Sequence, residues 1–311
     1  MRYFLGIDGG GTKTTCAVGD ESQLLATTTA GPSNIVRVGE VQARESLQQA
    51  VRQACAAAGI TPGQISRTCV GGSGAARAEL AAIVRTILAE VLPTPIEVVG
   101  DMQIALDAAF DTGPGVIVIA GTGSIAYGRD RQGGTARAGG WGFAIGDEGS
   151  AHWIGRAAVS AVLRASDRSY GTGKNVLDGE FATGLYKAWG VKSLADLARA
   201  ANSIPPPDYA ALFPAVSASQ DVLALQVLSS AGRELAQIAA IVMHRLFEDE
   251  ETTVPVAMIG GVFRHSQLVR RDFYNELRRA DPRAEIDPQV KEPVEGALRM
   301  ARRADSKGAS L

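Results

Sequence analysis

The stretch of sequence that decides the fold is residues 3–14, which read YFLGIDGGGTKT. A short apolar run ends here at Asp8 and three successive glycines, which is typical of a β-strand that enters a tight turn. Residues 14–18 and 24–28 have the composition of two further strands. We therefore expect the chain to open with a β-meander whose first turn is made of glycine.

Beyond this meander, strand-like and helix-like segments alternate. Residues 40–58 have apolar side chains at helical spacing, and Gly59 stands just past their end, where a helix-capping glycine belongs. Such alternation predicts an α/β fold with buried, largely parallel strand pairing. We expect strands at 67–70, 95–99 and 115–120 and helices at 76–90 and 102–110.

The pattern restarts near the middle of the chain. Residues 115–128, GVIVIAGTGSIAYG, again read as strand, small-residue turn and strand, which indicates two related halves. Residues 150–250 are mostly helical in pattern, and a strand at 254–259 precedes a closing helix at 292–303. We expect one domain over 1–115, joined by the helix 292–303, and a second over 116–291 that carries a helical insertion.

Composition bounds the class of protein. The chain has 311 residues, 46% of them hydrophobic, which suffices for about two domains. Lys and Arg total 31 against 33 Asp and Glu, so charge gives no reason to expect nucleic acid or a membrane surface as partner. The three cysteines form no CxxC pair, which argues against a disulfide framework or a cysteine-bound metal. No apolar run resembles a signal peptide or a membrane span, so we expect a cytoplasmic protein.

The first glycine turn, residues 9–13, has the composition of a phosphate-binding turn. Glycine lets the backbone approach an anion, and the N–H groups of a tight turn donate to phosphate oxygens. Thr12 and Lys13 add a hydroxyl and a positive charge, and Asp8 could hold a hydrated Mg²⁺. The turn is not a P-loop, because Thr12 stands before Lys13 and a strand follows instead of a helix. A hairpin turn that simply requires glycine is the alternative.

Two further features repeat or extend this chemistry. The second glycine turn, residues 121–124, reads GTGS, and the matched pair of turns favours the binding of one polyphosphate. Either turn alone is also typical of ordinary strand connections. Asp101 follows a strand and Gly100, so its carboxylate is expected at the carboxyl edge of the sheet, where ligands of α/β proteins bind. It could accept a proton from an attacking hydroxyl or cap the next helix, and the sequence favours neither.

Residues 139–150, GGWGFAIGDEGS, form the segment richest in candidate chemistry. Trp141 offers an apolar face for a sugar ring and Asp147 an acceptor for sugar hydroxyls, whereas Glu148 suits the start of the next helix. We favour a binding site here. Gly260 and Gly261 follow the strand at 254–259 and would let a flat base lie on bare backbone, although in isolation a plain strand-to-helix turn is a strong alternative.

Together these motifs resemble one family: GIDGGGTKT at the start, Asp101 after a strand, GTGS at 121, GGWGFAIGDEGSA at 139 and IGGV at 259. It is the BadF/BadG/BcrA/BcrD type of ATPase, in its N-acetylglucosamine kinase branch, within the actin-like, sugar-kinase and heat-shock ATPase superfamily. The resemblance runs from residue 3 to about residue 303. It implies an α/β fold of two ribonuclease-H-like (actin-like ATPase) domains, with ATP and Mg²⁺ in the interdomain cleft.

The resemblance also implies roles for individual residues. Asp101 matches the catalytic base, which also touches the substrate, and Asp8 would hold the metal through water. His265 would border the nucleotide, as would Gly260 and Gly261. The implied ATP-binding residues are Gly10, Gly11, Thr12, Lys13, Thr122, Gly260, Gly261 and His265. The implied substrate-binding residues besides Asp101 are Asn34, Ser73, Gly123, Ser124, Gly140, Trp141, Gly142, Asp147 and Ala151.

The expected activity is therefore an ATP-dependent kinase for the primary hydroxyl of an amino sugar, first of all N-acetylglucosamine to its 6-phosphate. Glucosamine and N-acetylmuramic acid are alternative substrates. An activator protein that hydrolyses ATP without sugar is a further alternative, but Cys16, Cys55 and Cys69 do not stand in the glycine-flanked loop that its bridging iron–sulfur cluster needs. A sugar sensor without turnover is disfavoured by Asp101. The family also implies a homodimer.

Overall fold

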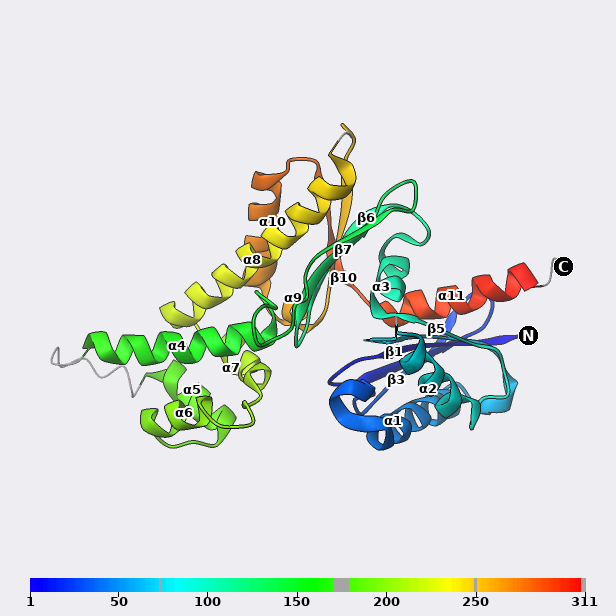
Figure 1. Ribbon diagram of the computed structural model, residues 1–311, viewed down its shortest axis with the longest axis horizontal. Coiled ribbons are helices and arrows are strands. Elements are labelled where there is room, and N and C mark those ends of the chain that lie inside the picture. The colour runs from blue at the N-terminus through cyan, green and yellow to red at the C-terminus, as the bar shows by residue number, and fades with distance from the viewer. Residues whose placement is uncertain (73, 76, 170–178, 249–250, 309–311) are drawn as a thin grey trace. The chain divides into compact units, whose positions relative to one another are not determined.

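The chain divides into two compact units in the computed structural model. One comprises Met1–Gly113 and Lys291–Leu311, and the other Pro114–Val290 (Figure 1). The structure describes all residues except 73, 76, 170–178, 249–250 and 309–311, and also leaves out the side chains of 305–308. Each unit is built on a five-stranded mixed sheet, which is the α/β architecture that the sequence predicts.

The sheet of the first unit has the order β3-β2-β1-β4-β5. β1 pairs with β2 and β2 with β3 in antiparallel fashion, so the predicted opening meander is present. β4 lies parallel to both β1 and β5. The strands are β1 (Tyr3–Gly9), β2 (Thr14–Gly19), β3 (Leu24–Ala30), β4 (Ile65–Gly72) and β5 (Ile96–Gly100).

Helices cover both faces of this sheet because adjacent residues of each strand point to opposite sides. Leu5 packs in a core with α1 and α2, whereas Phe4 packs in a second core with α3 and α11. The helix α11 lies so close to β1 that a Cβ on Gly6 would stand 2.4 Å from the backbone nitrogen of Leu298. The helical elements are α1 (Ile35–Ala57), η1 (Pro62–Gln64), α2 (Ala78–Ala89), α3 (Asp101–Phe110) and α11 (Pro293–Gly308).

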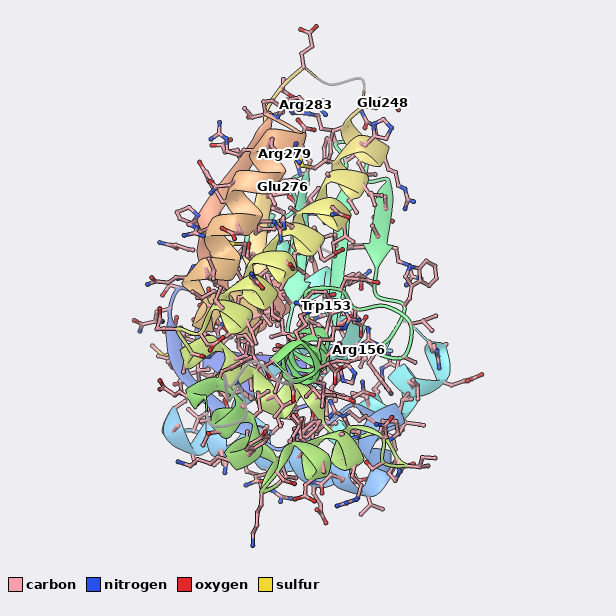
Figure 2. All side chains as sticks on the ribbon, turned by 90° about the vertical axis from the view of Figure 1, so that its left-hand side faces the viewer. Trp153, Arg156, Glu248, Glu276, Arg279 and Arg283 are labelled. Carbon is pink, nitrogen blue, oxygen red and sulfur yellow. The ribbon has the colours of Figure 1, made fainter. Side chains whose placement is uncertain are left out.

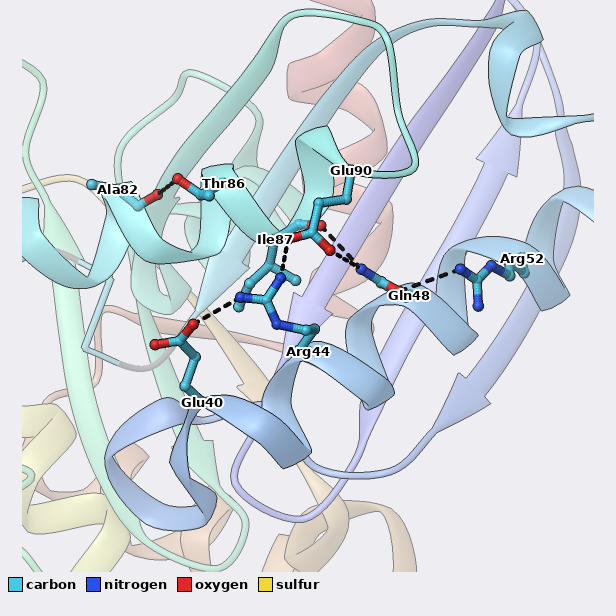
Figure 3. A network of polar contacts seen from close by, with 8 residues as sticks. All are labelled: Glu40, Arg44, Gln48, Arg52, Ala82, Thr86, Ile87 and Glu90. Carbon is cyan, nitrogen blue, oxygen red and sulfur yellow. Dashed lines mark hydrogen bonds and ion pairs between the residues drawn. The ribbon is translucent and has the colours of Figure 1, made fainter.

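An exposed polar network joins α1 to α2 (Figure 3). The Arg44 guanidinium bridges Glu40 on its own helix and Glu90 just past the end of α2. The Gln48 amide donates a 2.7 Å hydrogen bond to Glu90. Because these side chains are exposed or half-exposed to solvent, the network contributes little to the stability of the unit.

The sheet of the second unit has the order β10-β9-β6-β7-β8. β6, β7 and β8 form an antiparallel meander, and β9 lies parallel to β6. The sequence does not predict β10, which contains Pro288. It is an edge strand, the position in a sheet that tolerates proline because one row of N–H groups is unpaired. The strands are β6 (Gly115–Ala120), β7 (Ser124–Arg129), β8 (Thr135–Gly139), β9 (Val254–Ile259) and β10 (Ala284–Lys291).

The rest of the second unit is helical, as the sequence predicts for 150–250. α8 and α10 pack side by side, and Glu276 and Arg279 form an ion pair on α10 (Figure 2). Among the described helices, none alone is long and apolar enough to cross a membrane; Tyr209–Ala218 and Val222–Phe247, bent by 114°, meet that test only as a pair. The elements are α4 (Ala151–Ser169), α5 (Glu180–Trp189), α6 (Leu194–Ala201), η3 (Tyr209–Leu212), α7 (Phe213–Ala218), α8 (Val222–Phe247), α9 (Gly261–His265) and α10 (Gln267–Ala280).

Candidate active site

The first glycine turn joins β1 to β2 and is closed by backbone hydrogen bonds. The N–H of Gly10 donates to the carbonyl of Lys13 at 3.0 Å. The carbonyl of Gly10 in turn accepts from the N–H groups of Ser33 at 3.1 Å and Asn34 at 3.3 Å. The turn is therefore fixed from both sides, while Thr12 and Lys13 are solvent-exposed at its tip.

Strand register brings Asp8 and Asp101 to the same edge of the sheet. Asp8 pairs in register with Gly71 of β4, and Gly71 pairs with Val99 of β5, two residues before Asp101. Asp101 is the first residue of α3, behind Gly100 as N-cap, and its carboxylate accepts the Met102 N–H at 3.0 Å. The alternative in which Asp101 is itself the N-cap is therefore wrong.

The charges at this edge act on Asp8. Burial, together with the carboxylates of Asp101 and Glu292, raises the pKa of Asp8 from 3.8 to about 7, although the Lys13 ammonium opposes the shift. The ionised form of a carboxyl group whose pKa is raised in this way is stabilised by any further cation nearby. Within the described part of the chain, no group of three or more His, Cys, Asp or Glu side chains could hold a bare metal ion. A single carboxylate of this kind suits a hydrated Mg²⁺ contacted through water, because Mg²⁺ retains much of its octahedral water shell; the contact of Asp8 with Mg²⁺ stays a prediction.

Two predicted sugar-binding residues follow the turn in sequence. Asn34 lies beside the first turn, since its N–H donates to Gly10, and its side-chain oxygen caps α1 by accepting the Val36 N–H at 3.1 Å. Ser73 lies outside the described residues.

A residue that the sequence analysis missed, Arg37, lies against Gly11: a Cβ built on Gly11 would stand 3.4 Å from the Cδ and Nη1 atoms of Arg37. No local sequence motif predicts this contact, because Gly11 lies in the first glycine turn and Arg37 lies in α1.

The second glycine turn joins β6 to β7 and rests on the start of α4. The Gly121 N–H donates to the Gly123 carbonyl at 2.9 Å and closes the turn. The carbonyl of Gly121 accepts from the Ala151 N–H at 2.9 Å and that of Thr122 from the His152 N–H at 3.3 Å. The predicted residue Ala151 thus lies at the second turn through its backbone.

Asp147 connects this turn to the glycine-rich segment that follows β8. Its carboxylate is buried, at 8% exposure, and accepts N–H groups from Gly142 at 3.2 Å and from Ser124. A Cβ on Gly123 would stand 2.7 Å from Asp147 Oδ2. Burial raises the pKa of Asp147, and the hydrogen bonds from Gly142 and Ser124 oppose this shift. Asp147 therefore holds the loop to the turn, a use of the carboxylate that the sequence analysis did not anticipate; its contact with sugar hydroxyls stays a prediction.

Trp141 presents its indole ring to solvent. The residue is 66% exposed, and the Arg137 guanidinium lies 4.9 Å from the centre of its ring. Gly140 and Gly142 on either side have φ of 68° and 95°, values that favour glycine and turn the chain sharply around Trp141. A large exposed aromatic ring on such a loop suits the stacking of a sugar ring.

The third glycine pair lies at the end of β9. Gly260 has φ of 104°, and a Cβ there would stand 2.4 Å from the Ala120 carbonyl oxygen, so β9 approaches the end of β6 closely. Four residues after Gly261, His265 lines an open polar groove of roughly 1190 Å³ between the starts of α8 and α10. Ser229 and Arg233 of α8 also line it and were not predicted. A groove of this size and polarity can take a nucleoside.

Comparisons with known proteins identify the family to which the chain is similar. The family model of the BadF/BadG/BcrA/BcrD ATPases matches residues 5–301. An N-acetylmuramic acid/N-acetylglucosamine kinase of Clostridium acetobutylicum is 31% identical over 310 residues, which cover 97% of this chain and 99% of that protein. An N-acetyl-D-glucosamine kinase of Dictyostelium discoideum is 35% identical over 181 residues, 54% of this chain and 56% of that protein.

The structural comparison gives the same fold. A crystal structure from Chromobacterium violaceum, of a protein provisionally assigned as an N-acetylglucosamine kinase, matches with a TM-score of 0.73 and 24% identity. The match covers 97% of this chain and 99% of that one. The fold is the actin-like ATPase fold of two α/β domains. With the family model matching nearly the whole length, the chain belongs to the BadF/BadG/BcrA/BcrD ATPase family.

Proposed function

We propose that this protein is an ATP-dependent amino-sugar kinase that phosphorylates the primary hydroxyl of N-acetylglucosamine to give its 6-phosphate. The observation that carries the proposal is the Asp101 carboxylate, beside Asp8 at the carboxyl edge of the first sheet. The nearly full-length likeness to a kinase of N-acetylmuramic acid and N-acetylglucosamine supports the reaction class. N-Acetylmuramic acid and glucosamine are the alternative substrates.

Asp101 acts as the general base in this proposal. Its carboxylate accepts the proton of the sugar hydroxyl as the hydroxyl oxygen forms a bond to the γ-phosphorus of ATP. The bond from that phosphorus to the β–γ bridging oxygen breaks, and ADP leaves. The N–H groups of the first turn and the Lys13 ammonium stabilise the charge on the phosphoryl oxygens. Mg²⁺, when bound near Asp8, neutralises part of the same charge.

The second unit supplies binding groups. Trp141 stacks on the sugar ring, and Thr122 in the second turn donates to phosphate. The groove lined by His265 and Arg233 takes the nucleoside. Asn34 in the first unit hydrogen-bonds to the sugar. These roles, the homodimer and the cytoplasmic location stay predictions.

The buried cysteines disfavour the activator alternative. Cys16, Cys55 and Cys69 are all buried in the first unit, so none is exposed to share an iron–sulfur cluster with a second subunit. Burial also raises the pKa of each thiol, and a cluster ligand must be deprotonated.

The test is ADP release with Mg·ATP and a panel of N-acetylglucosamine, N-acetylmuramic acid and glucosamine, with the product's phosphate located by NMR. Asp101→Asn should lower kcat by about 10²-fold or more, since it removes the base, while sugar affinity changes little. Asp111→Asn is the matched control, because Asp111 lies at the other end of α3, Asn keeps the size of its side chain, and its exposed ion pair with Arg303 contributes little to stability. Equal ATP hydrolysis with and without every sugar would overturn the proposal.

A further inference from the structure

We propose that Arg37 binds a phosphate group of ATP at the first glycine turn. The inference rests on the proposed function in taking ATP as the ligand of that turn. Arg37 is solvent-exposed, and its Cδ and Nη1 atoms both lie 3.4 Å from the position of a Cβ on Gly11. The guanidinium group therefore lies directly over the bare backbone that is suited to an anion.

The backbone holds Arg37 in this place. The N–H groups of Ser33 and Asn34 donate to the Gly10 carbonyl, so the segment that carries Arg37 is attached to the turn itself. The hydroxyls of Thr14, the first residue of β2, and Ser33 are hydrogen-bonded to each other at 2.7 Å, which strengthens this attachment. The N–H of Arg37 then donates to the Asn34 carbonyl at 2.9 Å.

A break in α1 separates this segment from the rest of the helix. Gly39 has φ of 77° and ψ of 167°, which is not helical, and no atom lies within 4 Å of a Cβ built on it. Residues 35–38 are thus a single helical turn, and the continuous helix begins at Glu40. Because of this break, the direction of the main helix does not fix the position of Arg37; the glycine turn does.

The charges around the turn favour a phosphate as the ligand. Lys13 lies close enough to Asp8 to lower the pKa of that carboxyl. Throughout the described residues, Arg37 forms no ion pair or side-chain hydrogen bond. A guanidinium carries a planar fork of N–H donors that matches two oxygens of one phosphate. Two exposed cations, Lys13 and Arg37, thus lie at one turn.

Calorimetric titration of the full chain with Mg·ATP tests this role directly, without sugar. Arg37→Gln should weaken ATP binding about 10-fold or more, the effect of losing a charged hydrogen bond. The ATP affinity of Arg37→Lys should lie between those of the unsubstituted protein and Arg37→Gln, because lysine keeps the charge but lacks the planar fork of N–H donors. Arg52→Gln, on the same helix (Figure 3), is the matched control and should change the affinity less than twofold; its guanidinium donates to Gln48 at 3.3 Å.

Two results would overturn the inference. One is ATP affinity unchanged by Arg37→Gln, including the case in which that variant raises only the KM for N-acetylmuramic acid, which would assign Arg37 to the sugar's carboxylate. The other is a loss of melting temperature in Arg37→Gln that accounts for the weaker binding, with Arg37→Lys equally affected. Failure of the kinase proposal is seen separately, as absence of sugar-stimulated ADP release from an unsubstituted protein that still binds ATP. No ATP binding by the unsubstituted protein overturns both.

Discussion

The two glycine turns share one backbone device and differ in where their charges lie. Each is closed by an N–H to carbonyl bond of about the same length, 3.0 Å at Gly10 and 2.9 Å at Gly121. The first turn is supported by neutral groups such as Thr14 and Ser33, and its cations Lys13 and Arg37 face solvent. The second is supported by the buried carboxylate of Asp147.

On the proposed function, this difference separates ligand binding at the first turn from structural support at the second. An exposed cation without a protein partner costs little to maintain and gains most from a bound anion. A buried carboxylate must be hydrogen-bonded by the protein, and its partners then become fixed relative to one another. We infer that the cations Lys13 and Arg37 at the first turn are available to bind a ligand, whereas the Asp147 carboxylate at the second turn holds the loop in place.

The largest expected effect is on the support of the second turn. Asp147→Ala removes the acceptor of the N–H groups of buried Ser124 and half-buried Gly142, which should lower the free energy of unfolding by about 2–3 kcal/mol. The counterpart in the first unit, Thr14→Val, loses neutral hydrogen bonds to Gly31 and Ser33 and should cost about 1 kcal/mol.

Urea denaturation can assign each effect to its unit. All three tryptophans, Trp141, Trp153 and Trp189, lie in the second unit, so their fluorescence follows that unit, whereas circular dichroism follows both. Asp147→Asn, which keeps one acceptor oxygen, should fall between the unsubstituted protein and Asp147→Ala. An equal loss for Asp147→Ala and Thr14→Val would remove the distinction between the two turns.

A smaller effect is expected from added methyl groups. Gly123→Ala places a Cβ 2.7 Å from Asp147 Oδ2, which must shift, and should lower the unfolding free energy by about 1–2 kcal/mol. Gly121→Ala in the same turn meets no atom within 4 Å and is the matched control. Gly11→Ala in the first turn meets only the flexible end of Arg37 at 3.4 Å, so its cost should stay below about 0.5 kcal/mol.

Chemical denaturation of the three alanine variants in parallel decides the point. A stability loss at Gly121→Ala as large as at Gly123→Ala would mean that the backbone of the turn, and not contact with Asp147, requires glycine. The same series can be titrated with Mg·ATP, since both turns are proposed to contact phosphate and a methyl group at Gly11 lies beside Arg37.

Local patterns predicted most of the fold. The β1–β2 hairpin follows from a strand that ends in glycine, and Gly59, with φ of 70°, ends α1 as its position predicts, with the Ile60 N–H donating to the Cys55 carbonyl. What the sequence missed depends on neighbours distant in the chain. β10 contains Pro288 and is accepted as a strand only because it lies at the sheet edge.

The candidate site divides in the same way. The glycine motifs and Asp101 are visible as short patterns, and strand register then brings Asp101 close to Asp8. The position of Arg37 requires the loop at Ser33 to fold onto Gly10, and the burial of Asp147 requires Gly142 and Ser124 to converge on it. No spacing of residues in the sequence indicates either arrangement, so neither can be predicted before the fold is known.

The smallest effect concerns pH and contrasts two aspartates with opposite shifts. The N–H groups of Gln23 and Ser22 lower the pKa of Asp20, in the β2–β3 turn, from 3.8 to about 2. The unfolded chain therefore binds more protons between pH 4 and pH 2, so this contribution to stability is complete above pH 4 and is lost as the pH falls towards 2. Burial raises the pKa of Asp147, so its ionisation costs stability as the pH rises through that raised value.

Relative to the unsubstituted protein, Asp20→Asn should lose stability at pH 5 and little at pH 2, whereas Asp147→Asn should lose most at low pH. Urea denaturation across pH 2–7 checks both, and profiles that slope in the same direction would contradict the assignment of a hydrogen-bonded anion to the first unit and a desolvated one to the second.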